Sequence, residues 1–138
     1  MIDSHTHIYM PEFDSDRDDV IKRAMTAGVT SMILPNVDAQ SIDALHDTIL
    51  QYPTQCHAAM GLHPTSVDEQ YLSQLSRIRQ LFDSHHYIAV GEIGIDLYWD
   101  KTYKQQQCDA FATQITWARE LDLPIIIHCR EALDTTIE

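Results

Sequence analysis

The chain has 138 residues, of which 44% are hydrophobic, so it is long enough to bury the core of one domain. Twenty-one acidic residues against nine Lys and Arg give a formal net charge of −12. Such a surface argues against nucleic-acid binding through a basic patch, although bound cations could reverse the potential inside a cleft.

The cysteines and the apolar runs indicate a cytoplasmic protein. Cys56, Cys108 and Cys129 are odd in number and show no C-x-x-C spacing, which favours a reducing compartment over a disulfide framework. The start lacks the pattern of a secretory signal, and the apolar run at 123–129 is too short to cross a bilayer. We therefore expect no membrane partner.

Short runs rich in Val and Ile alternate along the chain with longer stretches of helical period. Strands are predicted at residues 1–7, 29–35, 56–62, 87–92 and 124–129. Helices are predicted at residues 16–27, 41–51, 71–84 and 103–121, and "EALDTTIE" at 131–138 begins a further one. This alternation predicts an α/β fold with a parallel sheet and helical crossovers.

Two architectures have this alternation, the open doubly wound sheet and the closed (β/α)₈ barrel. The doubly wound fold usually carries a glycine-rich turn after its first strand. Here that turn reads "HTHIYMPEFD" and contains no glycine, so phosphate binding at this position is not expected.

The opening "MIDSHTHIYM" places two histidines two residues apart. On an extended strand Asp3, His5 and His7 would point to the same face. The pattern is typical either of a metal clamp or of a polar surface strand.

Residue types that bind metal follow most of the predicted strands. They are His5 and His7 at the first, His63 at the third, Glu92 and Asp96 at the fourth, and His128 with Arg130 at the fifth. In a barrel these strand ends meet at one face. Burying imidazoles and a carboxylate together is costly without partners, and a divalent cation such as zinc or manganese offsets that cost. Glu92 has two oxygens and could bridge two ions.

The stretches "IDSHTH", "GLHP", "VGEIGIDLYW" and "PIIIHCREA", in this order, closely resemble the TatD family of metal-dependent hydrolases. The resemblance implies a TIM-like (β/α) barrel and two divalent metal ions (Mg, Mn or Zn). It also implies hydrolysis of phosphodiester bonds in DNA, with some relatives acting on aminoacyl-tRNA esters. By the same resemblance, His5 and His7 hold one ion, Glu92 bridges both and His128 holds the second.

The resemblance also gives His63 and Arg130 as substrate-binding residues. Each has a simpler reading, since His63 could merely end a strand and Arg130 could form a surface salt bridge. Tyr98 and Trp99, in the following loop, could stack a nucleobase or cover the core.

The sequence departs from the family pattern by its length. Family members have about eight strands, as the barrel requires, whereas five strands and four helices are predicted here. A second-metal histidine and a catalytic aspartate, which the family takes from later strands, have no matching motif. We expect residues 1–138 to be the N-terminal portion of a single hydrolase barrel domain, completed by a missing C-terminal half or by a partner chain.

Three other functions remain open from the sequence. Amidohydrolase-like barrels commonly bridge their metals with a modified lysine after the fourth strand, where this chain has Glu92 and no lysine. The polymerase-and-histidinol-phosphatase group shares the H-x-H opening but fits "GEIGID" less well. The third is a non-enzymatic one, an inactive half-barrel or an assembly subunit.

Overall fold

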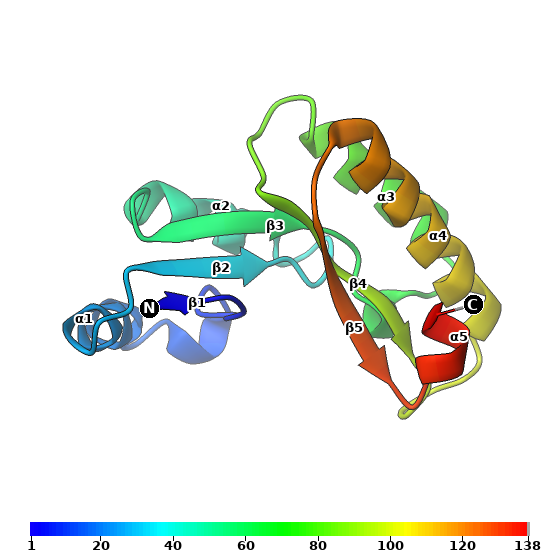
Figure 1. Cartoon of the computed structure of the whole chain (residues 1–138), viewed down its shortest axis with the longest axis horizontal. Helices are drawn as coiled ribbons and strands as arrows, with labels where there is room; N and C mark the ends of the chain where they lie inside the picture. Colours follow the sequence, from blue (N-terminus) through cyan, green and yellow to red (C-terminus); the bar gives the residue numbers. More distant parts are fainter. Residues whose placement is uncertain (138) are drawn as a thin grey trace.

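The computed structural model describes residues 1–137 as one five-stranded parallel sheet with helical crossovers (Figure 1). The strands are β1 (Ile2–Asp3), β2 (Ser31–Pro35), β3 (Cys56–Met60), β4 (Ala89–Asp96) and β5 (Ile125–Arg130). The helices are α1 (Arg17–Thr26), α2 (Ile42–Gln51), α3 (Tyr71–Leu81), α4 (Lys104–Leu121) and α5 (Leu133–Ile137), with short 3₁₀ turns η1 (Pro11–Phe13) and η2 (Pro64–Ser66).

The strands lie in the sheet in the order in which they occur along the chain, and every pair of neighbours is parallel. A doubly wound sheet reverses its strand order at a switch point, whereas a barrel adds each strand next to the previous one. The sheet therefore winds as part of a barrel. This confirms the predicted fold of five strands and four long helices, and α5 follows where a further helix was expected.

Two predicted strands differ from those in the structure by four residues at their C-terminal end, and the other three by two residues or fewer. The first was expected to reach residue 7 but ends at Asp3, whose carboxylate Oδ1 accepts a hydrogen bond from the His5 backbone N–H (3.1 Å). That local bond turns the chain out of the regular ladder. The fourth strand was expected to end at Glu92 but continues to Asp96, because all eight of its residues are buried between its neighbours.

The core forms where the helices pack on the sheet. Leu34 of β2, Met60 of β3, Leu45 of α2 and Ile78 of α3 are fully buried in one cluster. A second cluster lies between β4 and α4, which are close in space, with α3 beside α4 (Figure 1). No helix among residues 1–137 is both long enough and apolar enough to span a membrane.

Two glycines allow β4 and β5 to approach each other closely. A Cβ on Gly91 would lie 2.6 Å from the Ile126 Cβ, and a Cβ on Gly94 would collide with the backbone carbonyl of His128. Gly94 also has φ of +143°, where side chains are disfavoured. The pairing places Gly94 opposite His128 and Asp96 opposite Arg130. His128 therefore pairs with a position of β4 that lies midway between Glu92 and Asp96.

Candidate metal centre

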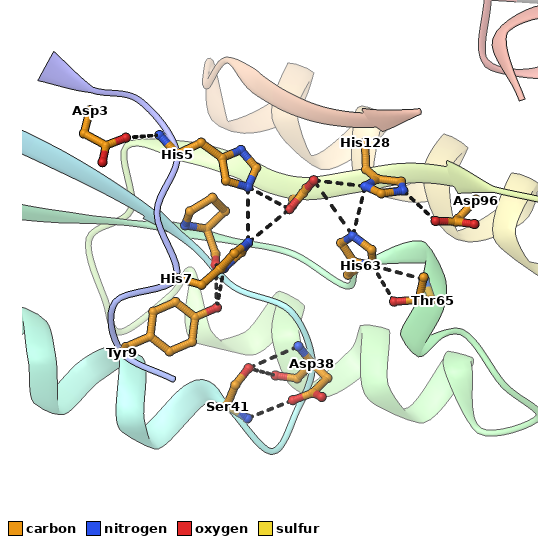
Figure 2. A network of polar contacts seen from close by, with 12 residues as sticks. Asp3, His5, His7, Tyr9, Asp38, Ser41, His63, Thr65, Asp96 and His128 are labelled. Atoms are coloured by element: carbon orange, nitrogen blue, oxygen red, sulfur yellow. Dashed lines mark hydrogen bonds and ion pairs between the residues drawn. The ribbon is translucent and has the colours of Figure 1, made fainter. Parts of the chain in front are cut away.

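Four histidines converge on the carboxylate of Glu92. His5 and His7 come from the segment after β1, His63 follows β3 and His128 lies on β5, as Figure 2 shows from close by. Glu92 lies within β4, and its side chain is 8% exposed. These five residues form two groups able to hold a cation, which are His5–His7–Glu92 and His63–Glu92–His128.

One carboxylate oxygen of Glu92 faces the first pair of histidines. Its Oε2 lies 3.0 Å from His5 Nε2 and 3.5 Å from His7 Nε2, and these two nitrogens are 3.2 Å apart. Ligand atoms held about 2.1 Å from one ion lie about 3.0–3.4 Å from each other. The three atoms therefore have the spacing of ligands on one face of a coordination sphere.

The other carboxylate oxygen faces the second pair. Glu92 Oε1 lies 3.2 Å from His128 Nδ1 and 3.8 Å from His63 Nε2, and these two nitrogens are 3.1 Å apart. The two oxygens of one carboxylate thus serve two separate sets of nitrogens, as a bridging ligand between two ions would.

Hydrogen bonding fixes the proton of His7 on the side away from Glu92. His7 Nδ1 lies 3.1 Å from the Pro35 carbonyl and 3.2 Å from the Tyr9 hydroxyl. The Tyr9 hydroxyl already donates to the Pro35 carbonyl at 2.6 Å, so both groups can only accept from His7. In the neutral ring the proton is therefore on Nδ1, and the Nε2 lone pair faces Glu92.

Asp96 orients His128 in the same way but from the opposite nitrogen. Asp96 Oδ2 accepts from His128 Nε2 at 2.8 Å, while its Oδ1 accepts from the Tyr98 backbone N–H at 3.0 Å. The Nδ1 of His128 is then free to present a lone pair toward Glu92. A carboxylate that holds a ligand histidine is a regular part of metal sites.

His63 has the opposite arrangement. Its Nδ1 accepts a hydrogen bond from the Thr65 backbone N–H (3.1 Å), and the Thr65 hydroxyl lies 2.7 Å away. In the neutral ring the proton is therefore on Nε2, which points at His128 Nδ1 and Glu92. That nitrogen is a donor, so His63 is suited to bind an oxygen anion rather than a cation.

Burial and charge set the ionisation of the centre. Burial acts to raise the pKa of Glu92, but at acidic pH, where the histidines are protonated, a hydrogen bond from His7 and the charges of His63, His5 and His128 outweigh it and lower that pKa to about 2. Burial lowers the pKa of His63 to about 4, so this ring is neutral at pH 7. Hydrogen bonds from Tyr98 and His128 outweigh burial and lower the pKa of Asp96. The centre thus contains two buried anions, and among residues 1–137 their ion-pair partners are all histidines. This donor set suits divalent cations of the zinc and manganese type.

One expectation for this region needs correction. Asp3 was expected to point with His5 and His7, but its carboxylate bonds the His5 backbone and lies outside the metal-ligand groups. The two histidines converge through the turn after β1, not through strand alternation. Arg130, which was predicted to bind substrate, lies at the exposed end of β5, with its guanidinium carbon 3.8 Å from the Tyr98 ring centroid, and this role stays a prediction.

Two residues of the centre were given no role by the sequence reasoning. Asp96 was noticed only as a polar strand end, although its spacing of four from Glu92 places both on one face of β4. Tyr9 had no signal in the sequence, because its contact with His7 depends on the position of Pro35 in β2.

The chain matches one family along nearly all of its length. The family model described as TatD related DNase matches residues 2–138. YabD of Bacillus subtilis (strain 168), named an uncharacterized metal-dependent hydrolase, is 33% identical over 137 residues, covering 99% of this chain and 53% of YabD. The 3'-5' ssDNA/RNA exonuclease TatD of Erwinia tasmaniensis is 35% identical over 132 residues, covering 96% of this chain and 51% of that protein.

Solved structures show the same fold. The crystal structure of YJJV, a TatD homolog from Escherichia coli K12, matches with a TM-score of 0.83 at 32% identity, covering 99% of this chain and 53% of that one. A TatD family hydrolase from Entamoeba histolytica shares the fold with a TM-score of 0.78 at 22% identity. The chain spans about half the length of the curated relatives it matches.

Proposed function

Because the chain belongs to the TatD family of metal-dependent hydrolases, we propose that it carries the metal centre of a nuclease that hydrolyses phosphodiester bonds of DNA. The observation that carries this proposal is the division of the Glu92 carboxylate between two sets of histidine nitrogens. A centre that binds two cations suits a phosphodiester, whose negative charge increases as the bond is broken. The naming of a relative as a 3'-5' ssDNA/RNA exonuclease supports a nucleic-acid substrate.

The metal ligands follow from the free lone pairs. His5 and His7 would hold one ion, His128 the other, and Glu92 would bridge both. Once bound, the ions would supply the Lewis acidity and positive charge that phosphodiester hydrolysis requires. They would also offset the net charge of −12, which otherwise repels a polyanion.

His63 and Arg130 would bind the substrate. His63 is neutral at pH 7 and presents Nε2–H toward the space between Glu92 and His128, so it can donate to a phosphate oxygen. Arg130 lies two residues after His128 on β5, which places its side chain on the same side of the strand. A guanidinium there would attract the adjoining phosphate.

We propose in addition that residues 1–138 are the N-terminal portion of a single barrel domain. The exposed Ile2 on β1 and Ile127 on β5 support this, because edge strands with apolar side chains normally pair or are covered. Further strands, from a continuation of the chain or from a partner, would supply a catalytic aspartate and complete the second metal site. The three free cysteines support a cytoplasmic location.

The test is metal-dependent cleavage by the protein in its natural full length. We expect degradation of a labelled single-stranded oligodeoxynucleotide with Mn²⁺ or Mg²⁺. The cleavage rate of Glu92→Ala should be lower by more than about 100-fold, a larger loss than the loss from removing a residue that only orients a metal ligand. Glu12→Ala, an exposed acid in η1, is the matched control and should cleave like wild type. Equal activity of Glu92→Ala and wild type, or no cleavage with any divalent ion, would contradict the proposal. Cleavage of an aminoacyl ester but not of DNA would favour the alternative function, hydrolysis of aminoacyl-tRNA esters.

A further inference from the structure

The loop between β4 and α4 carries two aromatic side chains at the surface. Tyr98 is 52% exposed and Trp99 is 72% exposed, and their rings stand perpendicular to each other with centroids 4.8 Å apart. The buried apolar clusters contain neither of these rings. The loop passes the end of β5, which carries His128 and Arg130 (Figure 1).

Arg130 lies over both rings, closer to that of Tyr98, and the Trp99 ring stays mostly exposed. Its guanidinium carbon lies 3.8 Å from the Tyr98 ring centroid and 5.4 Å from that of Trp99. This cation–π contact holds Tyr98 against the strand end and keeps a positive charge beside Trp99. Arg130 and His128 are two residues apart on one strand, a separation of about 7 Å along the backbone. The exposed Trp99 ring therefore lies near the end of β5 that carries His128.

A cavity of about 210 Å³ lies beside Trp99. Its lining includes Trp99, Asp100, Thr65, Asp68 and the buried carboxylate of Asp96. Thr65 contacts His63 and Asp96 contacts His128, so the cavity adjoins the second metal group. Three carboxylates repel a phosphate from this space but accept hydrogen bonds from a neutral base.

We propose that Trp99 and this cavity form a stacking site for one unpaired nucleobase, the base attached to the nucleotide beside the scissile phosphate. This proposal rests on the proposed nuclease function. The charged phosphate and the uncharged base of one nucleotide would occupy different parts of the site. The phosphate lies toward Arg130 and the metal centre, while the uncharged base stacks on Trp99 and enters the acidic cavity. Aromatic stacking does not distinguish strongly between bases, but it requires the base to be out of a duplex. The chain would therefore select a single-stranded end.

The first experiment compares cleavage of two single strands by the full-length protein. One strand carries all its bases, and the other lacks the bases of its terminal nucleotides. Loss of one stacked base weakens binding about 5- to 150-fold. We expect the KM of Trp99→Ala for the base-bearing strand to rise within that range, and its KM for the abasic strand to equal that of wild type. Trp99→Phe should recover most of the loss, and Leu50→Ala, an exposed apolar control on α2, should behave like wild type.

The second experiment measures binding without hydrolysis. Tryptophan fluorescence is recorded in EDTA with an oligonucleotide of methylphosphonate linkages, whose neutral backbone avoids repulsion by the acidic chain. Trp117 is buried and Trp99 is exposed, so we expect saturable quenching in wild type, none in Trp99→Phe and none with the abasic strand. Equal KM values for Trp99→Ala and wild type on the base-bearing strand, or equal quenching by both strands, overturn the stacking site. Base-dependent quenching without cleavage of either strand supports the stacking site and rejects the nuclease function.

Discussion

The hydrogen bond between Asp96 and His128 gives the sharpest test of the centre, through the substitution Asp96→Asn. The Tyr98 backbone N–H donates to Asp96 Oδ1 (3.0 Å), so the amide oxygen of an asparagine must take that position. The amide nitrogen is then placed where Oδ2 lies, 2.8 Å from His128 Nε2. Two donors would face each other, so Nε2 must give up its proton and accept instead. The proton moves to Nδ1, and the lone pair that faces Glu92 is lost.

We expect the affinity for only one of the two metal ions to decrease. Removing a partner that orients a ligand histidine typically reduces metal affinity 10- to 100-fold, or about 1.4–2.7 kcal/mol. His5 and His7 contact the other oxygen of Glu92, so their ion should keep its affinity. In the metal-free protein His128 Nδ1–H can donate to Glu92 Oε1, 3.2 Å away, but His63 Nε2–H, 3.1 Å from that nitrogen, loses its acceptor, so the free energy of unfolding should also fall.

Calorimetric titration of the metal-free, full-length protein with Mn²⁺ resolves the two affinities. Asp134→Asn, an exposed acid on α5, serves as the control for the loss of one charge. Long-range ¹H–¹⁵N correlation spectra report which nitrogen of His128 carries the proton. If Asp96→Asn left both affinities and the His128 tautomer as in wild type, the assignment of Asp96 as a positioning residue would be wrong.

Three further substitutions test the fold and its response to pH. Gln114→Leu removes an amide that bonds both the N–H and the C=O of buried Leu62, and should lower the free energy of unfolding by about 2–5 kcal/mol in urea titrations. Gly94→Ala places a Cβ against the β5 carbonyl and should reduce both the thermal unfolding temperature and the Mn²⁺ content measured by mass spectrometry. Burial and the stacked His85 ring lower the pKa of His46 from its ordinary 6.5, so stability should fall as pH drops below that value. His46→Gln should reduce the difference in the free energy of unfolding between pH 7.5 and pH 5.5, as measured by urea titration. An unchanged difference would exclude His46 as its cause.

The order of strands and helices could be read from the sequence because it depends on local patterns. Apolar runs and helical periodicity located every long element to within a few residues. The errors concern where two of the strands end. β1 ends early because Asp3 bonds the backbone of the next turn, and β4 continues to Asp96 because β5 covers it. The first effect is a local bond that the pattern of apolar residues does not record, whereas the second depends on β5, which is distant along the chain.

The site was predicted as far as residue type and strand position allow. Histidines and an acid at the ends of parallel strands indicated a shared edge, and the structure brings His5, His7, His63, Glu92 and His128 together there. The role of each nitrogen could not be predicted, because it depends on which carbonyl or carboxylate lies behind the ring. The Pro35 carbonyl behind His7 and the Thr65 amide beside His63 set opposite tautomers in two residues that look alike in the sequence.

The glycine-mediated contact between β4 and β5 has a consequence for how the protein matures. A nascent polypeptide cannot assemble the pocket around Glu92 Oε1 until the last of the five strands has been synthesised and has docked in register, since a slip by one residue would turn His128 to the other side. Under the proposed metal binding, cation uptake is then a late event that follows the pairing of β5 with β4. Cations at 100 times their dissociation constant would add about 2.7 kcal/mol to its stability. At low concentrations of divalent cations, newly synthesised chains would be less stable and more susceptible to proteolysis.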